Sequence, residues 1–371
     1  MIHLGIDSRD IFASQPRGVG KALIELFRHL LPLIPGWAVT LYTNRNENIE
    51  LPAPARIKEI DIRGDRFNAW ERIRLPIAAL ISRLDLLHCP SQTAPPLTPC
   101  PVILTVHDLI PLRMDDGWSA GEIRYFRKAM ARSIAKARRI IAVSEFTKKD
   151  LLSTFDIPEN KVDVVWWGVD RKVGQTPSEE LWQRLCQEHG IRSPFFVAFG
   201  GEAPRKNVPR ILKAFSRFTH ETKGEFQLVL LGVTATGERR FSLIMDQLGI
   251  SKQVILLGYL DDVVVCQLMR RSEALIYTSL YEGFGLPILE AMAIGTPVIT
   301  SNVTSMPEIA GEASLLVDPG DSRAIADAMR ECFANGVLRA DLKARGLQRV
   351  NDFSWERAAR ETLASYSRAL N

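Results

Sequence analysis

The sequence predicts an α/β protein built from two Rossmann-like domains. Its 371 residues are enough for two domains, and the composition, 46% hydrophobic and 24% charged, is that of a globular protein. Short runs rich in Val, Ile and Leu alternate with longer amphipathic segments, which is typical of parallel strands covered by helices. The alternation occurs in two series, so we expect one domain at 1–172 and a second at 173–353.

The expected strands follow from these short apolar runs, taken in chain order. In the first domain they are residues 2–6, 37–42, 101–106, 139–144 and 162–166. In the second they are residues 195–200, 226–232, 253–258, 274–278, 297–300 and 313–317. Residues 171–193 carry no strand pattern and form the expected crossover, while residues 321–371 read as helices, the last capped by Ser354. Two such domains facing each other would leave a cleft at the carboxyl ends of their strands, where ligands of these folds bind.

Charge and cysteine usage exclude several function classes. The 47 basic and 43 acidic residues give a net charge of +4, too small for a nucleic-acid-binding surface. The five cysteines lie far apart without a C-x-x-C pair, so we expect neither disulfides nor a zinc site and a reducing, cytoplasmic compartment. Asp7 and Arg9 interrupt the region where an export signal would be apolar, and no run approaches the ~20 apolar residues of a membrane span.

The most informative segment is YEGFGLPILEAMAIGTPVITSN, which follows the strand expected at 274–278. Gly283 and Gly285 allow the backbone to approach a ligand, and a helix beginning near Leu286 would direct its N–H groups at a phosphate. Glu282 precedes that helix and Glu290 lies inside it, so each could bind a different sugar ring. The alternative is that Glu282 caps the helix and Glu290 is solvated, but the apolar run after Glu290 favours a paired or functional charge.

A second candidate is FGGEAPRKNVPRILKAF, where a Gly-Gly turn follows the strand expected at 195–200. Arg205 and Lys206 stand there at the start of an amphipathic helix. A guanidinium and an ammonium side by side can neutralise a diphosphate as it leaves. Although adjacent cations are more often solvated, their position at the end of a strand favours phosphate binding.

Two signals in the first domain are weaker. Gly18 and Gly20 open a helix after the first strand, which suits either a substrate loop or tight helix packing; Gln15 and Ala22 exclude a Walker P-loop. His107 ends a strongly apolar strand, which favours a role at the substrate over that of a buried structural histidine.

Two pairs of acids invite a metal interpretation. Asp115–Asp116 and Asp261–Asp262 both lie in loop-like context without a histidine at ligand spacing. We expect both pairs to be solvated and the protein to hold no metal.

At these residues the sequence resembles the retaining glycosyltransferases of family 4, the GT-B group that transfers sugars from nucleotide donors. The resemblance extends over nearly the whole chain, and its most specific element is Glu282 and Glu290 with GFG between them. Further matching motifs are the Gly18 loop, His107, Gly200 to Asn207, and residues 143–151, 164–170 and 306–321. One departure is that Val19 separates Gly18 from Gly20, where the family often has adjacent glycines.

The resemblance implies a role for each matching residue. Arg205 and Lys206 would bind the donor diphosphate, Glu290 the nucleotide ribose, and Glu282 the transferred hexose. The other implied donor contacts are Gly18, Gly258, Tyr259, Leu260, Gly283, Phe284, Gly285 and Leu286, with residues 258–260 meeting the base and His107 reaching the hexose. The final helix, residues 354–371, would pack back on the N-terminal domain, and neither a cofactor nor a metal would be needed.

The implied function is retaining transfer of a hexose from a GDP- or UDP-sugar to a glycan or polyprenyl-linked saccharide in bacterial surface polysaccharide, such as lipopolysaccharide, synthesis. Mannosyl- and rhamnosyltransferases are the nearest types. A nucleotide-sugar epimerase or hydrolase and a silent sugar-nucleotide-binding module remain alternatives. The basic segment EIRYFRKAMARSIAKARR could contact an anionic membrane peripherally, at the inner face of the plasma membrane, or form a solvated amphipathic helix.

Overall fold

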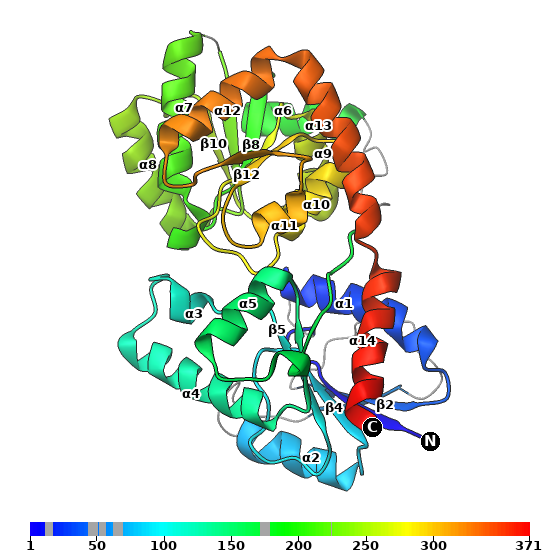
Figure 1. Cartoon of the computed structure of the whole chain (residues 1–371). Coiled ribbons are helices and arrows are strands. Elements are labelled where there is room, and N and C mark those ends of the chain that lie inside the picture. Colours follow the sequence, from blue (N-terminus) through cyan, green and yellow to red (C-terminus); the bar gives the residue numbers. More distant parts are fainter. Residues whose placement is uncertain (12–17, 44–50, 52–56, 62–69, 171–178, 224) are drawn as a thin grey trace. The chain divides into compact units, whose positions relative to one another are not determined.

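The structure, a computed structural model, describes residues 1–11, 18–43, 51, 57–61, 70–170, 179–223 and 225–371. The chain divides into two compact units (Figure 1). Unit 1 comprises Met1–Arg113, Trp118–Gly168 and Phe353–Asn371, and unit 2 comprises Met114–Gly117 and Val169–Asp352. The short segment Met114–Gly117 thus packs with unit 2 although both of its neighbours in the chain belong to unit 1.

The described part of unit 1 contains a parallel sheet of seven strands in the order β3-β2-β1-β4-β5-β6-β7. The strands are β1 (His3–Asp7), β2 (Ala38–Thr43), β3 (Ile57–Asp61), β4 (Leu86–Cys89), β5 (Val102–Val106), β6 (Arg139–Ala142) and β7 (Val162–Val164). Central strands such as β4 and β5 are buried throughout, because helices cover both faces of the sheet. From β1 the chain adds β2 and β3 toward one edge of the sheet, then crosses back to β4 on the other side of β1 and adds strands toward the opposite edge, as in a doubly wound fold.

The helices of unit 1 lie on the two faces of this sheet. Their bounds are α1 (Val19–Leu30), α2 (Leu75–Ile81), α3 (Ile110–Arg113), α4 (Ala120–Lys136), α5 (Glu145–Thr154) and α14 (Trp355–Leu370). Helices α2 and α4 share one core cluster, whereas α14 packs along α1 and over β4 to β6. Ser354 caps α14 by accepting a hydrogen bond from the Arg357 N–H, as the sequence predicts.

A buried histidine connects α14 to the sheet of unit 1. On the α14 face of β4, His88 Nδ1 lies 2.6 Å from the Tyr366 hydroxyl, and Nε2 lies 2.8 Å from Thr105 Oγ1. Gly168 permits the close approach of the chain to α14, since a Cβ there would lie 2.3 Å from the Trp355 nitrogen. The last helix is therefore an integral part of unit 1.

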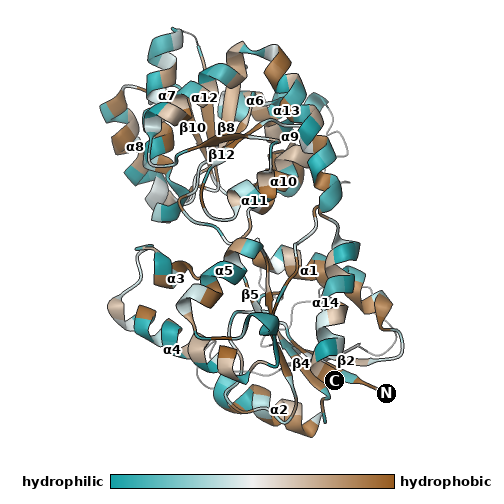
Figure 2. Cartoon of the chain, viewed as in Figure 1, coloured by the Kyte–Doolittle hydropathy of each residue, from teal (hydrophilic) through white to brown (hydrophobic). Residues whose placement is uncertain are grey.

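In unit 2 the described strands form a six-stranded parallel sheet in the order β10-β9-β8-β11-β12-β13. These strands are β8 (Phe195–Phe199), β9 (Gln227–Leu231), β10 (Val254–Leu257), β11 (Leu275–Tyr277), β12 (Val298–Ser301) and β13 (Leu315–Val317). The covering helices are α6 (Glu179–His189), α7 (Val208–Thr222), α8 (Ala235–Leu248), α9 (Asp262–Arg271), α10 (Leu286–Ala293), α11 (Met306–Ala310), α12 (Ser322–Ala334) and α13 (Gly336–Arg349). Figure 2 shows hydrophobic strands inside a layer of mixed helices, so each unit has its own core.

All eleven segments expected to be strands coincide with strands, to within two residues at either end. The structure adds β3 and β4, which the sequence analysis did not single out. The crossover expected at 171–193 begins in residues 171–178, outside the described part of the chain, and continues as α6.

Candidate functional site

Two loops meet at the carboxyl end of the unit 2 sheet. Strands β8 and β11 are neighbours, and the chain turns in opposite directions from them, which is where ligands bind in doubly wound sheets. A 3₁₀ turn, Pro204–Lys206, follows β8, and the residues around Glu282 follow β11. The Leu280 N–H donates to the Arg205 carbonyl at 2.7 Å, so the two loops are held together by their backbones.

Lys206 lies at the centre of this site. Its Nζ donates to Glu282 Oε1 at 2.6 Å and to the Tyr277 hydroxyl at 3.2 Å. The ammonium also lies 5.1 Å from the centre of the Tyr277 ring, within the range of a cation–π contact. A Cβ at Gly201 would lie 3.1 Å from Lys206 Cγ, so the Gly-Gly turn leaves space for the lysine stem. The fold therefore fixes the direction of this ammonium group.

Arg205 is held by two carboxylates. Its Nη1 donates to Glu282 Oε1 at 2.9 Å, and its Nε lies 3.2 Å from Asp116 Oδ2. Asp116 Oδ1 also accepts the Arg205 backbone N–H at 3.1 Å. The Asp116 side chain is only 8% exposed. The prediction that Asp115–Asp116 is a solvated pair is thus wrong for Asp116, because the Arg205 guanidinium and backbone attract its carboxylate into unit 2.

Asn207 fixes the end of the Arg205–Lys206 turn. It is buried with a φ of 62°, a left-handed conformation that asparagine tolerates better than most residues. Its side-chain amide donates to the Thr278 carbonyl at 2.9 Å and to the Pro319 carbonyl at 2.8 Å. The sequence analysis assigned no role to Asn207, since both of its partners are distant in the chain.

The Glu282 loop is fixed from the opposite side by Ser305. The Ser305 Oγ lies 2.7 Å from the Phe284 carbonyl oxygen and 2.9 Å from the Glu282 carbonyl oxygen, so its single O–H hydrogen is shared between the two carbonyls. Helix α10 begins at Leu286, as predicted, with Gly285 at φ 112° before it. No side chain caps this helix, so Glu282 does not act as the cap that the alternative interpretation required.

Burial and charge act on Glu282 in opposite directions. Burial alone would raise its pKa, but the charges of Lys206 and Arg205 outweigh that effect and hold the pKa below its usual value. Burial raises the pKa of Tyr277 well above its ordinary value, and the nearby Glu282 carboxylate raises it further. The site therefore holds an ionised carboxylate next to a neutral tyrosine at neutral pH.

The remaining predicted residues of unit 2 lie in the helix that follows the Glu282 loop and in the segment after β10. Glu290 is half-buried in α10, and residues 258–260 follow β10 directly. The Gly258 carbonyl accepts a hydrogen bond from the Gly232 N–H, which follows β9, at 3.1 Å. Tyr259 is 46% exposed at this edge. Their roles at a ligand stay predictions.

In unit 1, His107 ends β5 as predicted and is buried. Because a carbonyl can only accept, its Nε2 must carry the hydrogen donated to the Pro90 carbonyl at 2.6 Å. Burial lowers its pKa to about 4, so the ring is neutral at pH 7 and Nδ1 is an acceptor. Nδ1 is buried and has no hydrogen-bond partner among the described residues. The histidine thus has both the backbone bond of a structural residue and an unused acceptor.

The predicted glycine loop of unit 1 lies partly outside the described residues. Gly18 is described, adopts φ 39° and directly precedes α1, which begins at Val19. A Cβ on Gly18 would meet nothing within 4 Å, so packing does not require glycine here, whereas the backbone conformation favours it.

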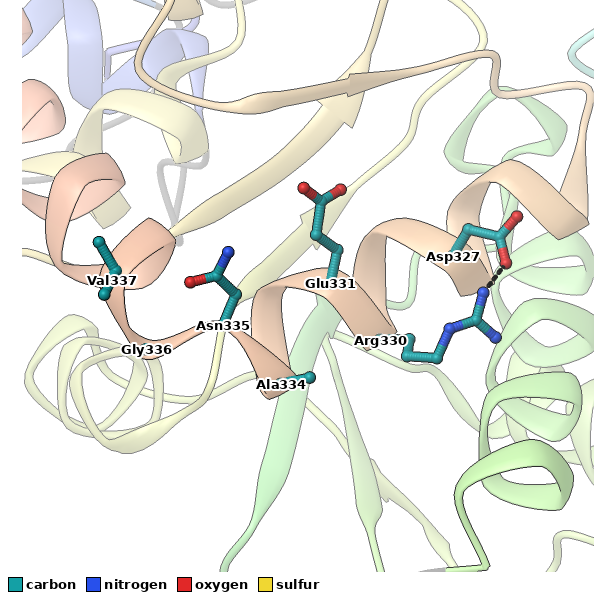
Figure 3. A pocket seen from close by; sticks show the side chains of 7 residues that line it. All are labelled: Asp327, Arg330, Glu331, Ala334, Asn335, Gly336 and Val337. Atoms are coloured by element: carbon teal, nitrogen blue, oxygen red, sulfur yellow. Dashed lines mark hydrogen bonds and ion pairs between the residues drawn. The ribbon is translucent and has the colours of Figure 1, made fainter.

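A hollow at the turn between α12 and α13 is unrelated to this site (Figure 3). The Arg330 side chain extends there toward Asp327, with which it forms an ion pair, and it also pairs with Glu221 of α7. None of the predicted site residues lines it. Across the described residues, no group of three or more His, Cys, Asp or Glu side chains is arranged to hold a metal ion.

Comparison with known proteins gives two family matches that together cover most of the chain. The family described as "Glycosyltransferase Family 4" matches residues 16–173, and "Glycosyl transferases group 1" matches residues 185–349. The chain is 29% identical over 266 residues to O-antigen chain mannosyltransferase B of Escherichia coli, covering 71% of this chain and 69% of that protein. It is 28% identical over 280 residues to the E. coli serotype-specific mannosyltransferase WbdA, covering 73% of this chain but only 34% of WbdA.

A solved structure agrees with the whole fold. The structure of Anabaena HepE in complex with UDP and glucose superposes with a TM-score of 0.76, covering 99% of each chain. At 17% identity this likeness concerns the fold alone.

Proposed function

This chain is a family 4 glycosyltransferase with the GT-B fold, and we propose that it transfers mannose from a nucleoside diphosphate sugar to a saccharide acceptor with retention of configuration. The mannosyl group is proposed because the E. coli relatives are mannosyltransferases of O-antigen chains and serotype determinants. We place the donor at the unit 2 site, with GDP or UDP as the nucleotide.

A hydrogen-bond donor on Lys206 carries the proposal. An ammonium group has three N–H donors, and Lys206 gives two of them to Glu282 and Tyr277. The third has no partner within the described part of the chain. The Lys206 ammonium shares Glu282 Oε1 with the Arg205 guanidinium, and α10 begins, without a side-chain cap, four residues after Glu282 in the chain. A diphosphate is the ligand whose charge and oxygen atoms suit this set of donors.

In the proposed reaction, the bond between the sugar C1 and the diphosphate oxygen breaks, and the acceptor oxygen forms a bond to C1 on the same face. The acceptor proton passes to the leaving diphosphate oxygen. Lys206 and Arg205 stabilise the negative charge that develops on that oxygen, and they are already oriented before the donor binds. Glu282 binds hydroxyl groups of the hexose and does not act as a nucleophile, because two cations hold its Oε1.

Further contacts are proposed from the family resemblance. Glu290 binds the ribose and residues 258–260 meet the base, while Gly283 to Leu286 contact the donor through their backbone. His107 Nδ1 accepts a hydrogen bond from a hydroxyl of the hexose, and Gly18 lies near the donor phosphate and the acceptor. No residue in this scheme needs a metal ion or a cofactor.

We also propose a polyprenyl-linked saccharide as the acceptor and the cytoplasmic face of the membrane as the location, with a peripheral contact to an anionic bilayer. No helix in the described ranges has the length and apolarity that crossing a bilayer requires.

The proposal is tested by incubating the protein with GDP-mannose, UDP-glucose or UDP-N-acetylglucosamine and a short saccharide carrying a polyprenyl-like lipid. We expect a new α-linked mannose from GDP-mannose in the presence of the acceptor only. Release or conversion of the sugar without acceptor would identify a hydrolase or epimerase, and donor binding without turnover would identify a silent binding module. A β-linked product would contradict retention, since the donor sugar is α-linked.

A further inference from the structure

The helical segment Trp70–Ile81 of unit 1 is buried on only one side. It consists of a π-helical turn, Trp70–Arg74, that continues into α2 (Leu75–Ile81). Trp70, Leu75 and Ala79 are fully buried and belong to the core cluster that also contains Met130 and Ile134 of α4. The segment is therefore anchored to unit 1 by its inner side alone, and the side chains on its outer side take no part in that core.

The outer side of this segment is apolar. Ile73 is 57% exposed, Ile77 51%, Leu80 62% and Ile81 76%. Ile77 follows Ile73 by four residues, and Leu80 and Ile81 follow Ile77 by three and four. Residues three or four apart lie on the same side of a helix, so these side chains form one side over successive turns. We call these four residues the α2 apolar stripe; α2 is among the strongly hydrophobic helices in Figure 2. Single exposed apolar residues are ordinary, but a continuous stripe indicates a surface that is covered in use.

Arginines border the α2 apolar stripe. Arg72 and Arg83 are exposed and Arg74 is half-buried, and none of them forms an ion pair with a described residue. The one acid of the segment, Glu71, is buried and pairs with Arg9 in the interior. The surface around the stripe therefore carries positive charges that form no ion pair among the described residues.

Helix α4, which packs on the same core cluster as α2, also carries exposed cations. They are Arg124, Arg127, Lys128 and Arg132. Its acid, Glu122, is engaged in the capping box of Ser119. In the loop after β4, Leu97 is 73% exposed, and the adjacent Thr98 carbonyl accepts a hydrogen bond from Lys136 Nζ of α4 at 3.4 Å.

We propose that the α2 apolar stripe docks unit 1 on an anionic lipid bilayer. Ile77, Leu80 and Ile81 would enter the boundary between headgroups and acyl chains, while Arg72 and Arg74 would extend to the lipid phosphates. The cations of α4 would add long-range attraction to the charged surface without inserting. This inference specifies the bilayer contact of the proposed function, and its test does not depend on the transfer reaction.

The charge pattern selects a bilayer over a second copy of the chain. A symmetric dimer through this face would place the same patch opposite itself, so that Arg72, Arg74 and Arg83 of each copy would approach like charges. Like charges facing each other across an interface cost several kcal/mol, whereas anionic headgroups attract the same residues. An apolar stripe with a cationic border therefore matches a membrane surface.

The test is co-sedimentation of the full-length protein with vesicles of phosphatidylcholine alone or mixed with phosphatidylglycerol. We expect the wild type to bind the mixed vesicles and to bind phosphatidylcholine vesicles much more weakly. The double variant Ile77→Ser/Ile81→Ser should lose at least about tenfold in vesicle affinity, since it removes two inserting side chains. Arg72→Gln/Arg74→Gln should also weaken binding, and should reduce its dependence on salt.

A matched control is Leu243→Ser/Val337→Ser, which changes two apolar residues of unit 2 that are at least as exposed on average, at 67% and 82%, and should bind as the wild type does. Wild-type vesicle binding by Ile77→Ser/Ile81→Ser would overturn the proposal, as would a wild type that ignores anionic vesicles. A dimer that this variant dissociates, with vesicle binding unchanged, would assign the stripe to self-association instead. Transfer to a water-soluble acceptor should be unchanged in the stripe variant, so the proposed function can fail without this inference failing.

Discussion

Lys206 Nζ and Glu282 Oε1 lie 2.6 Å apart although the two residues are 76 positions apart in the chain. They are brought together because β8 and β11 are neighbours in the sheet and the loops after both strands meet at its carboxyl end. Asn207 and Ser305 fix these two loops from either side through hydrogen bonds to backbone carbonyls. The charged groups are thus oriented in the absence of a ligand, which is the condition for efficient electrostatic stabilisation of a leaving group.

Replacing Glu282 by glutamine should separate nucleotide binding from sugar transfer. The change keeps the size of the side chain but removes the negative charge that partly neutralises Lys206 and Arg205. We therefore expect GDP or UDP to bind at least as tightly as to the wild type, while transfer falls by about 100-fold or more because the hexose loses its carboxylate. Calorimetry with the nucleotide and kinetics with the full donor measure the two effects. A parallel loss of nucleotide affinity would show that Glu282 instead positions Lys206 and Arg205 for the diphosphate.

Asp116 should act through Arg205. Asp116→Asn keeps an acceptor for the Arg205 backbone N–H but removes the charge beside Nε, so we expect transfer to fall by about tenfold. Combined with Arg205→Ala, the effect of Asp116→Asn should largely disappear, which a double-mutant cycle measures. The neighbouring, exposed Asp115→Asn is the control and should change nothing. Fully additive losses would show that Asp116 does not position Arg205.

The stability of unit 1 should fall in mild acid because of His88. Burial lowers the pKa of His88 from 6.5 to about 3, so between these values the unfolded chain binds a proton that the folded chain does not. The free energy of unfolding should therefore rise with pH between about 3 and 6.5, by up to about 1.4 kcal/mol per pH unit for this group. The buried His107, with a pKa of about 4, adds a similar slope over a narrower range.

Thermal unfolding of the wild type and of His88→Asn at pH 5.0, 5.5, 6.0 and 6.5 measures this dependence. The variant should be less stable at every pH, since its contacts with Tyr366 and Thr105 change, but its stability should vary less with pH. The lowered pKa of His88 is tested by how steeply stability changes with pH, and not by the melting temperature at any one pH. An unchanged slope would mean that His88 takes up its proton in the folded state as readily as in the unfolded chain.

Much of the fold could be predicted because the strands are buried on both faces. Continuous apolar runs such as residues 226–232 mark strands of a parallel sheet without any knowledge of their neighbours. Strand β4 (Leu86–Cys89) could not be found in this way, because it is short and contains His88. The histidine is tolerated there because both ring nitrogens have partners, Tyr366, 278 residues away, and Thr105 on the next strand. The family resemblance is confirmed by the two family matches.

The site residues that the sequence analysis missed have partners far away in the chain. Asp116 lies 89 residues from Arg205, and no local pattern distinguishes it from the exposed Asp115. Arg9, which lies outside the site, shows the same limit: it is buried and paired with Asp7 and Glu71, whereas its position in the sequence indicates only that the segment is not apolar. Glycine turns, helix starts and paired charges are local signals, whereas the carboxylate that orients a cation is chosen by the tertiary structure.

The central claim is that Lys206 binds the diphosphate of the donor, and calorimetric titration of GDP and UDP into Lys206→Ala tests it most directly. Exposed Lys213→Ala on α7 is the matched control, since it removes the same charge from the same unit away from the site. We predict that Lys206→Ala, still folded by thermal unfolding, weakens binding of the preferred nucleotide by about 100-fold, while Lys213→Ala binds as the wild type does. Equal nucleotide affinity in wild type and Lys206→Ala would contradict the account.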